Sequence, residues 1–347
     1  MSDEILSLIY TFSKKFSDPE TNLSFDPKNQ NISAVVKDGN VNISLLVKGQ
    51  KEDPYLNIAR LLKNNVEQIS GVLSVNVIIN SDLNRNKKNN SDEKRFKIDA
   101  KNIVAIASGK GGVGKSTFSV NLATALNSLD LRIGLLDADI YGPSIPRMMG
   151  ISQKPIMNEN KKLIPLENYG IKLMSIGFIL DSEAPTIWRG PMVMKALEQM
   201  FNGVEWGELD YLIIDLPPGT GDAQLTLAQS SKLSGSIVIS TPQDVALTDA
   251  RKGINMFKKV NVDILGIVEN MSYFICDNCD KKHYIFSKDG VKKEAENFKI
   301  PFLGEIPIET NLRIQSDNGV PALIDNPEGE ISKKFISIAK NLKKALD

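Results

Sequence analysis

The sequence contains very few residues that ligate soft metals: two cysteines, Cys276 and Cys279, and one histidine, His283. Two cysteines in 347 residues exclude a disulfide framework and favour a metal or redox site. A thiolate metal or cluster site usually takes four ligands, so one chain supplies only half of them. The pair stands in "FICDNCDKK" with C-x-x-C spacing, and the open question is what completes it.

Charge excess and long apolar runs are also absent. Lys plus Arg equals Asp plus Glu at 42 each, which gives no electrostatic case for nucleic acid, and we expect no such partner. No stretch of 18 apolar residues occurs, so no span of a bilayer is expected. The start of the chain lacks the basic segment and apolar core of a signal peptide. We therefore expect a cytoplasmic protein without stable membrane association.

A polar stretch divides the chain. Residues 80–95, "NSDLNRNKKNNSDEKR", contain one apolar residue, Leu83, and cannot bury enough surface to offset their ordering entropy. We predict a flexible linker over residues 80–100. Residues 1–79 predict a small α+β domain of order α-β-β-α-β, with "KDGN" as the turn between the first two strands.

Residues 101–347 show a different pattern, in which short apolar runs alternate with helical segments. Continuous apolar strands separated by helices indicate an α/β domain whose mainly parallel, doubly wound sheet is covered on both faces. The predicted strands are "NIVAIA", "IGLLD", "IKLMSIG", "YLIIDLP", "SIVIS", "ILGIVEN" and "PFLGEIP".

A phosphate-binding loop follows the first of these strands. In "IASGKGGVGKST", Gly109, Gly114, Lys115 and Ser116 fit G-x-x-x-x-G-K-[ST]. The glycines let backbone N–H groups approach phosphates, and the following helix adds its N-terminal dipole. Lys115 would reach the β- and γ-phosphates of ATP and the Ser116 hydroxyl would hold Mg²⁺. The strand before and the amphipathic helix after disfavour a chance glycine loop.

Acidic and amide side chains end three other strands. The segment "LLDADIYGPS" ends a strand with Asp137 and Asp139, and Asp215 stands in "YLIIDLPPGTGD" as a Walker B-type carboxylate. Carboxylates at the carboxyl ends of parallel strands lie where ligands bind. For each of these two acidic segments taken alone, the alternative is a turn at the end of a strand with a solvated Asp. Asn270 ends "ILGIVEN", and its amide suits an adenine edge or a strand cap.

The second lysine of the loop, Lys110, resembles that of the deviant Walker A class of P-loop ATPases, which includes cell-division and partition ATPases. The resemblance implies that Lys110 reaches across a dimer to the partner's nucleotide. It further implies that Asp139 orients the attacking water, Asp137 supports the Mg²⁺ shell, Gly219 senses the γ-phosphate and Asn270 contacts adenine. A solvated lysine on a turn is the alternative for Lys110.

Longer segments resemble the Mrp/Nbp35 group of iron–sulfur cluster carrier ATPases: "DADIYGPSIPRMMG", "IWRGPMVMKALEQ", "DLPPGTGDAQLTLAQ", "STPQDVAL" and "VENMSYFICDNC". This resemblance implies slow, Mg²⁺-dependent ATP hydrolysis by a homodimer. It also implies a four-iron four-sulfur cluster held by Cys276 and Cys279 of both chains and transferred to apo iron–sulfur proteins. The N-terminal domain is similar to the MIP18-like domain, but "KGQKEDPY" stands where related domains carry a cysteine.

The motifs and the resemblance together assign the site residues. Catalytic roles fall to Lys110, Lys115 and Asp139, cluster ligation to Cys276 and Cys279, and Mg²⁺ ligation to Ser116. Nucleotide contacts fall to Gly109, Lys110, Gly111, Gly112, Val113, Gly114, Lys115, Ser116, Thr117, Asp137, Asp215, Gly219 and Asn270.

Other hypotheses remain for the cysteines. C-x-x-C is also a thioredoxin-like redox motif, but here it comes late in the domain. Cys276, Cys279 and His283 form C-x-x-C-x-x-x-H, three ligands of a tetrahedral zinc site, and a zinc ion shared by two chains would use the same cysteines.

A spatial switch, in which ATP-driven dimerisation controls membrane or DNA attachment, is the alternative of another class. The lysine-rich "ISKKFISIAKNLKKAL" gathers apolar residues on one helical face, which suits a membrane surface or a docked final helix. In "IWRGPMVMKALEQMF", Gly190 and Pro191 predict a helix start, and Arg189 would face nucleotide or partner, or act as a structural cap.

Overall fold

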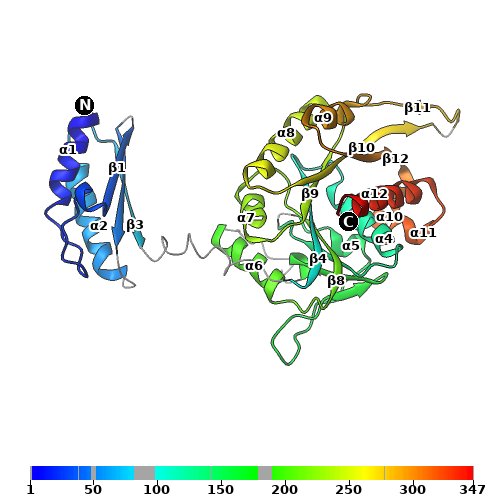
Figure 1. Cartoon of the computed structure of the whole chain (residues 1–347), viewed down its shortest axis with the longest axis horizontal. Coiled ribbons are helices and arrows are strands. Elements are labelled where there is room, and N and C mark those ends of the chain that lie inside the picture. The colour runs from blue at the N-terminus through cyan, green and yellow to red at the C-terminus, as the bar shows by residue number, and fades with distance from the viewer. Residues whose placement is uncertain are drawn as a thin grey trace. The chain divides into compact units, whose positions relative to one another are not determined.

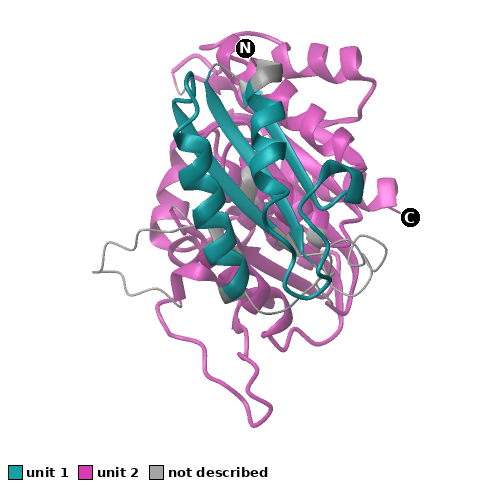
Figure 2. Ribbon diagram, turned by 90° about the vertical axis from the view of Figure 1, so that its left-hand side faces the viewer, with its two compact units in different colours: residues 1–94 teal, residues 95–347 magenta. Residues whose placement is uncertain are grey.

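The computed structural model describes residues 2–37, 39–47, 52–81, 98–140, 142–178, 190–276 and 278–346. The chain divides into two compact units, residues 1–94 and 95–347 (Figure 2). Residues 82–97, which make up most of the predicted linker, lie outside the described residues, as does Arg189. Each unit is described by itself below.

Unit 1 is a three-stranded sheet with two helices on one face (Figure 2). Strands β1 and β2 form an antiparallel hairpin, and β2 pairs with β3 in parallel after the crossover through α2. This order confirms the predicted α-β-β-α-β pattern. The elements are α1 (Ser2–Ser13), a 3₁₀ turn (Pro27–Asn29), β1 (Ile32–Lys37), β2 (Asn40–Val47), α2 (Glu52–Glu67) and β3 (Ser74–Ser81).

The core of unit 1 follows from the alternation along β2. Val41, Ile43, Leu45 and Val47 are buried, because successive side chains of a strand point to opposite faces. They pack with buried residues of α1 and α2, such as Ile9 and Tyr55, in a cluster drawn from unit 1 alone. Unit 1 therefore has a hydrophobic core of its own.

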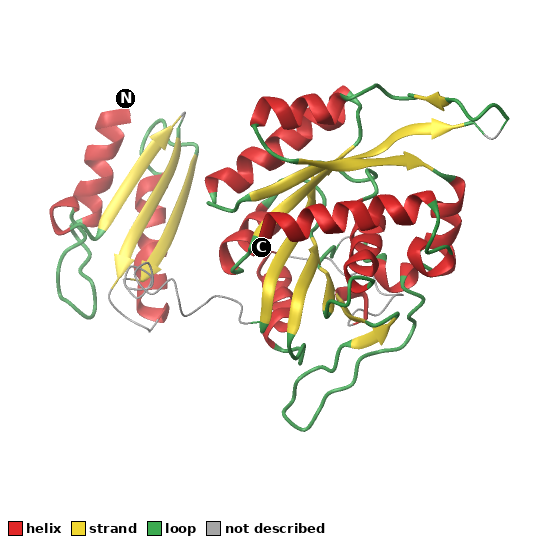
Figure 3. Cartoon of the chain, turned by 45° about the vertical axis from the view of Figure 1, so that its right-hand side comes forward, coloured by secondary structure: helices red, strands yellow, loops and turns green. Residues whose placement is uncertain are grey.

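Unit 2 is an α/β domain built on one mainly parallel sheet (Figures 1 and 3). The strand order is β11-β10-β9-β4-β8-β5-β7-β6, with β12 also pairing with β10. Its strands are β4 (Ala100–Ser108), β5 (Ile133–Asp137), β6 (Leu166–Asn168), β7 (Ile171–Ser175), β8 (Leu209–Asp215), β9 (Gly235–Ser240), β10 (Ile264–Ile275), β11 (Lys282–His283) and β12 (Phe302–Ile308).

All seven predicted strands of unit 2 are present. The two additional strands, β6 and β11, are short antiparallel hairpin partners of β7 and β10. Two and three residues are too few to produce a readable alternation of polar and apolar side chains. The fold class predicted from the sequence is confirmed.

Helices cover both faces of the sheet, as in a doubly wound fold (Figure 1). One layer holds α4 (Lys115–Asn127), α5 (Ile145–Met148), α10 (Thr310–Asn318), α11 (Ala322–Asp325) and α12 (Glu330–Leu346). The other holds α6 (Gly190–Asn202), α7 (Asp222–Ser230), α8 (Asp244–Lys259) and α9 (Gly290–Phe298). A 3₁₀ turn (Ile176–Phe178) follows β7, and α6 begins at the predicted Gly190.

The apolar face of α12 is used inside unit 2. Phe335, Ile338, Ala339 and Leu342 are buried, and the rings of Phe335 and Phe118 lie 5.9 Å apart between α12 and α4. This face therefore packs on the domain as a docked final helix does. Among the described residues, no helix is both long enough and apolar enough to cross a bilayer.

Candidate functional site

The carboxyl end of β4, in the middle of the sheet, carries the phosphate loop. Ser108 ends β4, α4 begins at Lys115, and the neighbouring strands β8 and β5 end at Asp215 and Asp137. Parallel strands bring these ends to one edge of the sheet. A cavity of about 190 Å³ opens there, lined by Ser108, Lys110, Gly111, Gly112, Gly114, Lys115, Ser116, Thr117, Asp139, Ser144, Met148 and Pro218.

The loop backbone requires glycine at particular positions. Gly112 and Gly114 have φ of 80° and 82°, in the left-handed region that residues with a side chain rarely adopt. A Cβ on Gly114 would lie 2.2 Å from Asn270 Nδ2, whereas one on Gly111 would meet nothing within 4 Å. The loop is thus held on one side by Asn270, whose Nδ2 donates to Val113 O at 2.7 Å, and open to the cavity on the other.

Lys115 is the most buried cation of the site. Its side chain is 6% exposed, and Nζ lies 2.8 Å from Asp215 Oδ2 and 3.7 Å from Asp139 Oδ2. Nζ makes ion pairs here but no well-directed hydrogen bond. A buried ammonium with unused donors suits an anionic phosphate oxygen, because charge-assisted hydrogen bonds are the strong ones.

Asp215 is fully buried and held by two hydroxyls of α4. Ser116 Oγ donates to its Oδ2 at 2.6 Å and Ser119 Oγ donates to its Oδ1 at 2.7 Å. Hydroxyl and carboxylate oxygens are the donors that Mg²⁺ prefers, so Ser116 and Asp215 fit that ion. Ser119 was not assigned from the sequence, although its spacing of three residues from Ser116 places both on one helix face.

Asp137 and Asp139 occupy different environments. Asp139 lines the cavity, while Asp137 lies fully buried behind it. Asp137 accepts hydrogen bonds from the Ser175 hydroxyl at 2.9 Å and from the backbone N–H of Asp139 at 3.2 Å. Burial and the neighbouring Asp215 carboxylate raise the pKa of Asp137 to about 7. Asp137 is therefore placed to orient Asp139 and to change charge near neutral pH.

Lys110 stands at the mouth of the cavity. Its Nζ donates to Gln243 Oε1 at 3.3 Å, and Gln243 is the N-cap residue of α8. This contact joins the phosphate loop to the segment "STPQDVAL". No single residue of that segment was assigned a role from the sequence. Gly219 lies beyond β8, and its N–H donates to Ser108 O at 3.0 Å.

Most of the predicted nucleotide residues meet at this one sheet edge. Lys110, Lys115, Ser116, Thr117 and Asp139 line the same cavity, and Asp215 contacts two of them. Asn270 reaches the loop through its amide nitrogen rather than lining the cavity. The role of each residue toward a nucleotide stays a prediction.

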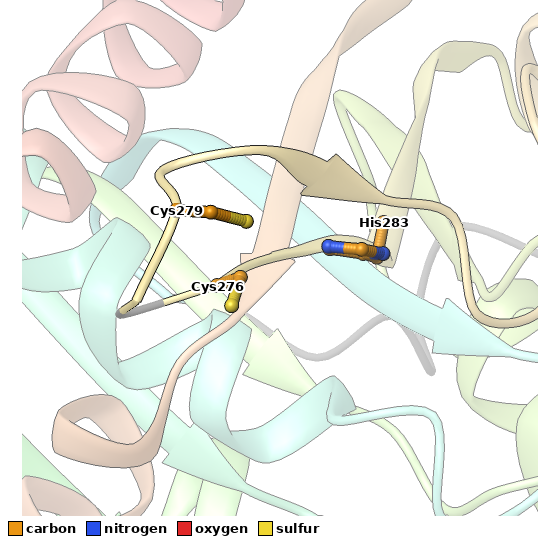
Figure 4. A group of neighbouring side chains, drawn as sticks. All are labelled: Cys276, Cys279 and His283. Carbon is orange, nitrogen blue, oxygen red and sulfur yellow. The ribbon is translucent and has the colours of Figure 1, made fainter.

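The two cysteines are not among the residues that line this cavity, and they lie at the turn of the β10–β11 hairpin (Figure 4). Cys276 directly follows β10, and Cys279 is exposed. The turn is closed by hydrogen bonds from Cys276 N to Lys281 O at 3.1 Å and from Asp280 N to Cys276 O at 2.8 Å. Both thiols are free of disulfides.

His283 joins the cysteines. Antiparallel pairing in the hairpin sets His283 opposite Phe274, two residues before Cys276. The ligand atoms of Cys276, Cys279 and His283 all lie within 4.8 Å of one another. Figure 4 shows the imidazole extending toward the two cysteines. The hairpin thus gathers three soft or borderline metal ligands from one chain.

Relatives of known sequence match 71% of the chain in one case and nearly the whole chain in another. The mitochondrial iron-sulfur protein required for NADH dehydrogenase of Arabidopsis thaliana is 55% identical over 247 residues, covering 71% of this chain and 79% of the relative. The iron-sulfur cluster carrier protein of a Synechocystis species is 40% identical over 339 residues, covering 96% of each.

Solved structures show the same fold. The nucleotide-binding protein of Archaeoglobus fulgidus in complex with ADP matches with a TM-score of 0.59 and 38% identity, covering 68% of this chain and 93% of that one. The cell division ATPase MinD of Pyrococcus furiosus matches with a TM-score of 0.52 at 21% identity, covering 70% and 99%. The second likeness concerns the fold alone.

A family model described as "ParA: NUBPL iron-transfer P-loop NTPase" matches residues 99–343. That range includes the phosphate loop, the three strand-end aspartates and the cysteine hairpin. Because this family model spans more than half of the chain, and the Arabidopsis relative is 55% identical over 71% of the chain, the chain belongs to the NUBPL-type iron-transfer P-loop NTPases of the ParA family.

Proposed function

We propose that this protein is an ATP-dependent iron–sulfur cluster carrier. It binds and slowly hydrolyses ATP with Mg²⁺, and it holds a four-iron four-sulfur cluster between two copies of the chain for transfer to apo-proteins. The names of its relatives in Aquifex aeolicus and Synechocystis, both iron-sulfur cluster carrier proteins, support the class of cargo.

The observation that carries the proposal is the path of β10. Asn270, within this strand, donates to the carbonyl of Val113 in the phosphate loop. Cys276 comes six positions later, directly after the strand ends, which corresponds to about 20 Å of extended chain. Strand β10 therefore links the phosphate loop to the cysteine pair, and a nucleotide that moves the loop acts on an element that leads to the thiolates.

The strand is irregular between these two points. Met271 has φ of 54°, and the register of β10 against β12 shifts between Asn270 and Phe274. A residue other than glycine in the left-handed region stores strain that the surrounding structure must hold. This break gives the hairpin a local element that can respond to the loop.

In the nucleotide site, the residues of the chain bind the phosphates, orient the attacking water and exclude other water. Lys115 exchanges its carboxylate partners for phosphate oxygens, and the N–H groups at the start of α4 face the same anion. Asp139, held through Asp137, orients the attacking water. Ser116 would hold Mg²⁺, with Asp215 acting through the water bound to the ion, and the ion would neutralise the phosphate charge.

The cysteine hairpin offers half of a cluster site and an apolar surface beside it. Ile275, Tyr284, Ile285 and Phe286 flank the cysteines and are 38–58% exposed. Neighbouring exposed apolar side chains mark an interaction surface, and a two-fold axis here brings a second pair of thiolates to the first. Two chains then provide the four thiolates that such a cluster takes.

The test is anaerobic reconstitution with iron and sulfide in mixed dimers. Wild-type chains and chains with both Cys276→Ser and Cys279→Ser are mixed in equal amounts and allowed to assort, and the cluster is measured by visible absorption and iron analysis. Only wild-type pairs hold four thiolates, so cluster per chain falls to about a quarter of the wild-type value. Retention of about half, with assortment verified by mass spectrometry, would rule out the bridge.

A further inference from the structure

The hairpin contains a ligand that the bridging cluster does not use. Four thiolates complete a cluster across two chains, yet His283 lies with Cys276 and Cys279 in each chain. His283 is the only histidine in the sequence. We propose that each chain by itself binds one divalent transition-metal ion, of the Zn²⁺ class, through the two cysteine sulfurs and the His283 imidazole, with the fourth position open to solvent.

The spacing of the three ligands suits a single ion. In a tetrahedral site with metal–sulfur bonds of about 2.3 Å, neighbouring ligand atoms are about 3.8 Å apart. The three ligand atoms here lie within 4.8 Å of one another, so at most about 1 Å of approach is needed. Cys279 and His283 are exposed at the hairpin tip, so rotation of their side chains supplies that approach without rebuilding the backbone.

The backbone already holds the ligands in this arrangement. Pairing of β10 with β11 fixes His283 opposite Phe274, and the hydrogen bond from Cys276 N to Lys281 O closes the loop between them. The adjacent Lys282 points elsewhere, because its Nζ lies over the Tyr273 ring at 4.2 Å from the ring centre. Alternation along the strand therefore directs His283 to the side of the cysteines (Figure 4).

The chemistry of the ligand set selects the ion. Two thiolates and one neutral imidazole favour Zn²⁺ and its spectroscopic substitute Co²⁺ over Mg²⁺ or Ca²⁺, which prefer oxygen. Two thiolates balance the 2+ charge of the ion, which binds the deprotonated sulfurs. With three ligands from the described residues, two of them exposed, the fourth position is taken by water.

This site goes beyond the proposed function because it needs one chain, no sulfide and no nucleotide. It also competes with the cluster, since both use the same two sulfurs. A chain loaded with a single ion is thus withheld from cluster binding until the ion leaves, which the open fourth position and the exposed imidazole make feasible.

The test is titration of the reduced, metal-free full chain with Zn²⁺ under anaerobic conditions, with the histidine labelled with ¹⁵N. One histidine gives one pair of imidazole nitrogen signals, so ligation is read without ambiguity. We expect saturation at one ion per chain and a shift of one imidazole nitrogen at that stoichiometry. Saturation at one ion per two chains would assign the ion to a four-thiolate bridge. An unshifted imidazole would show that His283 does not bind the ion, and either result would overturn the proposal.

Two matched variants complete the test. His283→Ala should weaken Zn²⁺ binding by about 10-fold or more in competition with a chelator, while Lys282→Met, the neighbouring change in β11, should leave the affinity unchanged. Equal affinity in wild type and His283→Ala would refute the single-chain site. Iron–sulfide reconstitution of His283→Ala should give wild-type cluster content, and failure of wild type to take up cluster would count against the carrier function while leaving the Zn²⁺ result to stand.

Discussion

The nucleotide cavity and the cysteine hairpin lie on the same domain but are completed in different ways. Lys115 and Asp215 are buried and already paired with each other, and hydroxyls from α4 hold the carboxylate. Cys279 and His283 are exposed, and the described residues of the hairpin bring three possible metal ligands together. The residues of the cavity are preorganised within one chain, whereas the ligand set of the hairpin is completed by a second chain or by a metal ion with its water. Changes in the cavity should therefore affect both stability and binding, and changes in the hairpin should affect binding alone.

The largest expected effect is that of Lys115→Ala. Loss of a charge-assisted hydrogen bond to phosphate should weaken Mg²⁺–ATP binding by about 10- to 100-fold or more, measured by isothermal titration calorimetry. It also leaves the fully buried Asp215 without its cation, which should lower the free energy of unfolding by about 3–5 kcal/mol.

A double variant, Lys115→Ala with Asp215→Asn, separates the two effects. It removes both charges, so it should regain much of the lost stability without regaining nucleotide affinity. Wild-type ATP affinity in a folded Lys115→Ala protein would remove the cavity from consideration as the nucleotide site.

The second effect concerns turnover. Lys110→Ala is the same substitution in the same loop, but the Lys110 ammonium contacts only the neutral Gln243 among the described contacts. If Lys110 acts on the partner's nucleotide, hydrolysis should fall by about 100-fold or more while ATP affinity changes little. Gln243→Ala, which frees Lys110 without removing it, is the matched control and should retain hydrolysis. Undiminished turnover in Lys110→Ala would contradict the role across the dimer.

The difference between the two sites also explains what the sequence allowed us to predict. The phosphate loop was predictable because its glycines, lysine and serine are contiguous and their roles follow from backbone geometry. The seven principal strands were predictable because buried strands are continuous apolar runs. The link from Asn270 to the loop carbonyl of Val113 was not, since its two ends are 157 positions apart and only the folded sheet joins them.

The hairpin was predictable in part. C-x-x-C identified the cysteines, but the position of His283 depends on the pairing of β11, a strand of two residues with no periodic signal. Spacing alone could not decide between a loop histidine and a ligand. Likewise, Ser175 and Gln243 became part of the site only through strand order and helix capping, which no local motif encodes.

A smaller effect is expected from pH. The pKa of Asp137 is raised to about 7 in the folded protein, against about 4 in the unfolded chain. The folded state then binds more protons, so this contribution to stability is complete below pH 4 and is lost as pH rises toward 7. Relative to Asp137→Asn, the wild-type unfolding free energy should fall by on the order of 2 kcal/mol between pH 5 and pH 8.

Urea unfolding followed by tryptophan fluorescence measures this difference. Both tryptophans, Trp188 and Trp206, belong to unit 2 by position, so the signal reports the domain that contains Asp137. Parallel pH profiles for wild type and Asp137→Asn would show that the carboxyl does not titrate in this range.

The smallest effect is expected from removing unit 1. Every residue of the cavity and the hairpin belongs to residues 95–347. The buried residues of the unit 1 core all lie between Ile5 and Val75. A chain that starts at Arg95 should therefore fold, and its ATP hydrolysis and cluster content should stay within about twofold of the full protein. Residues 1–94 alone, which lack cysteine, are the control and should bind neither ligand. If a cooperatively folded fragment from Arg95 loses either activity, then unit 1 contributes to that site, and the two sites cannot be compared as properties of one domain.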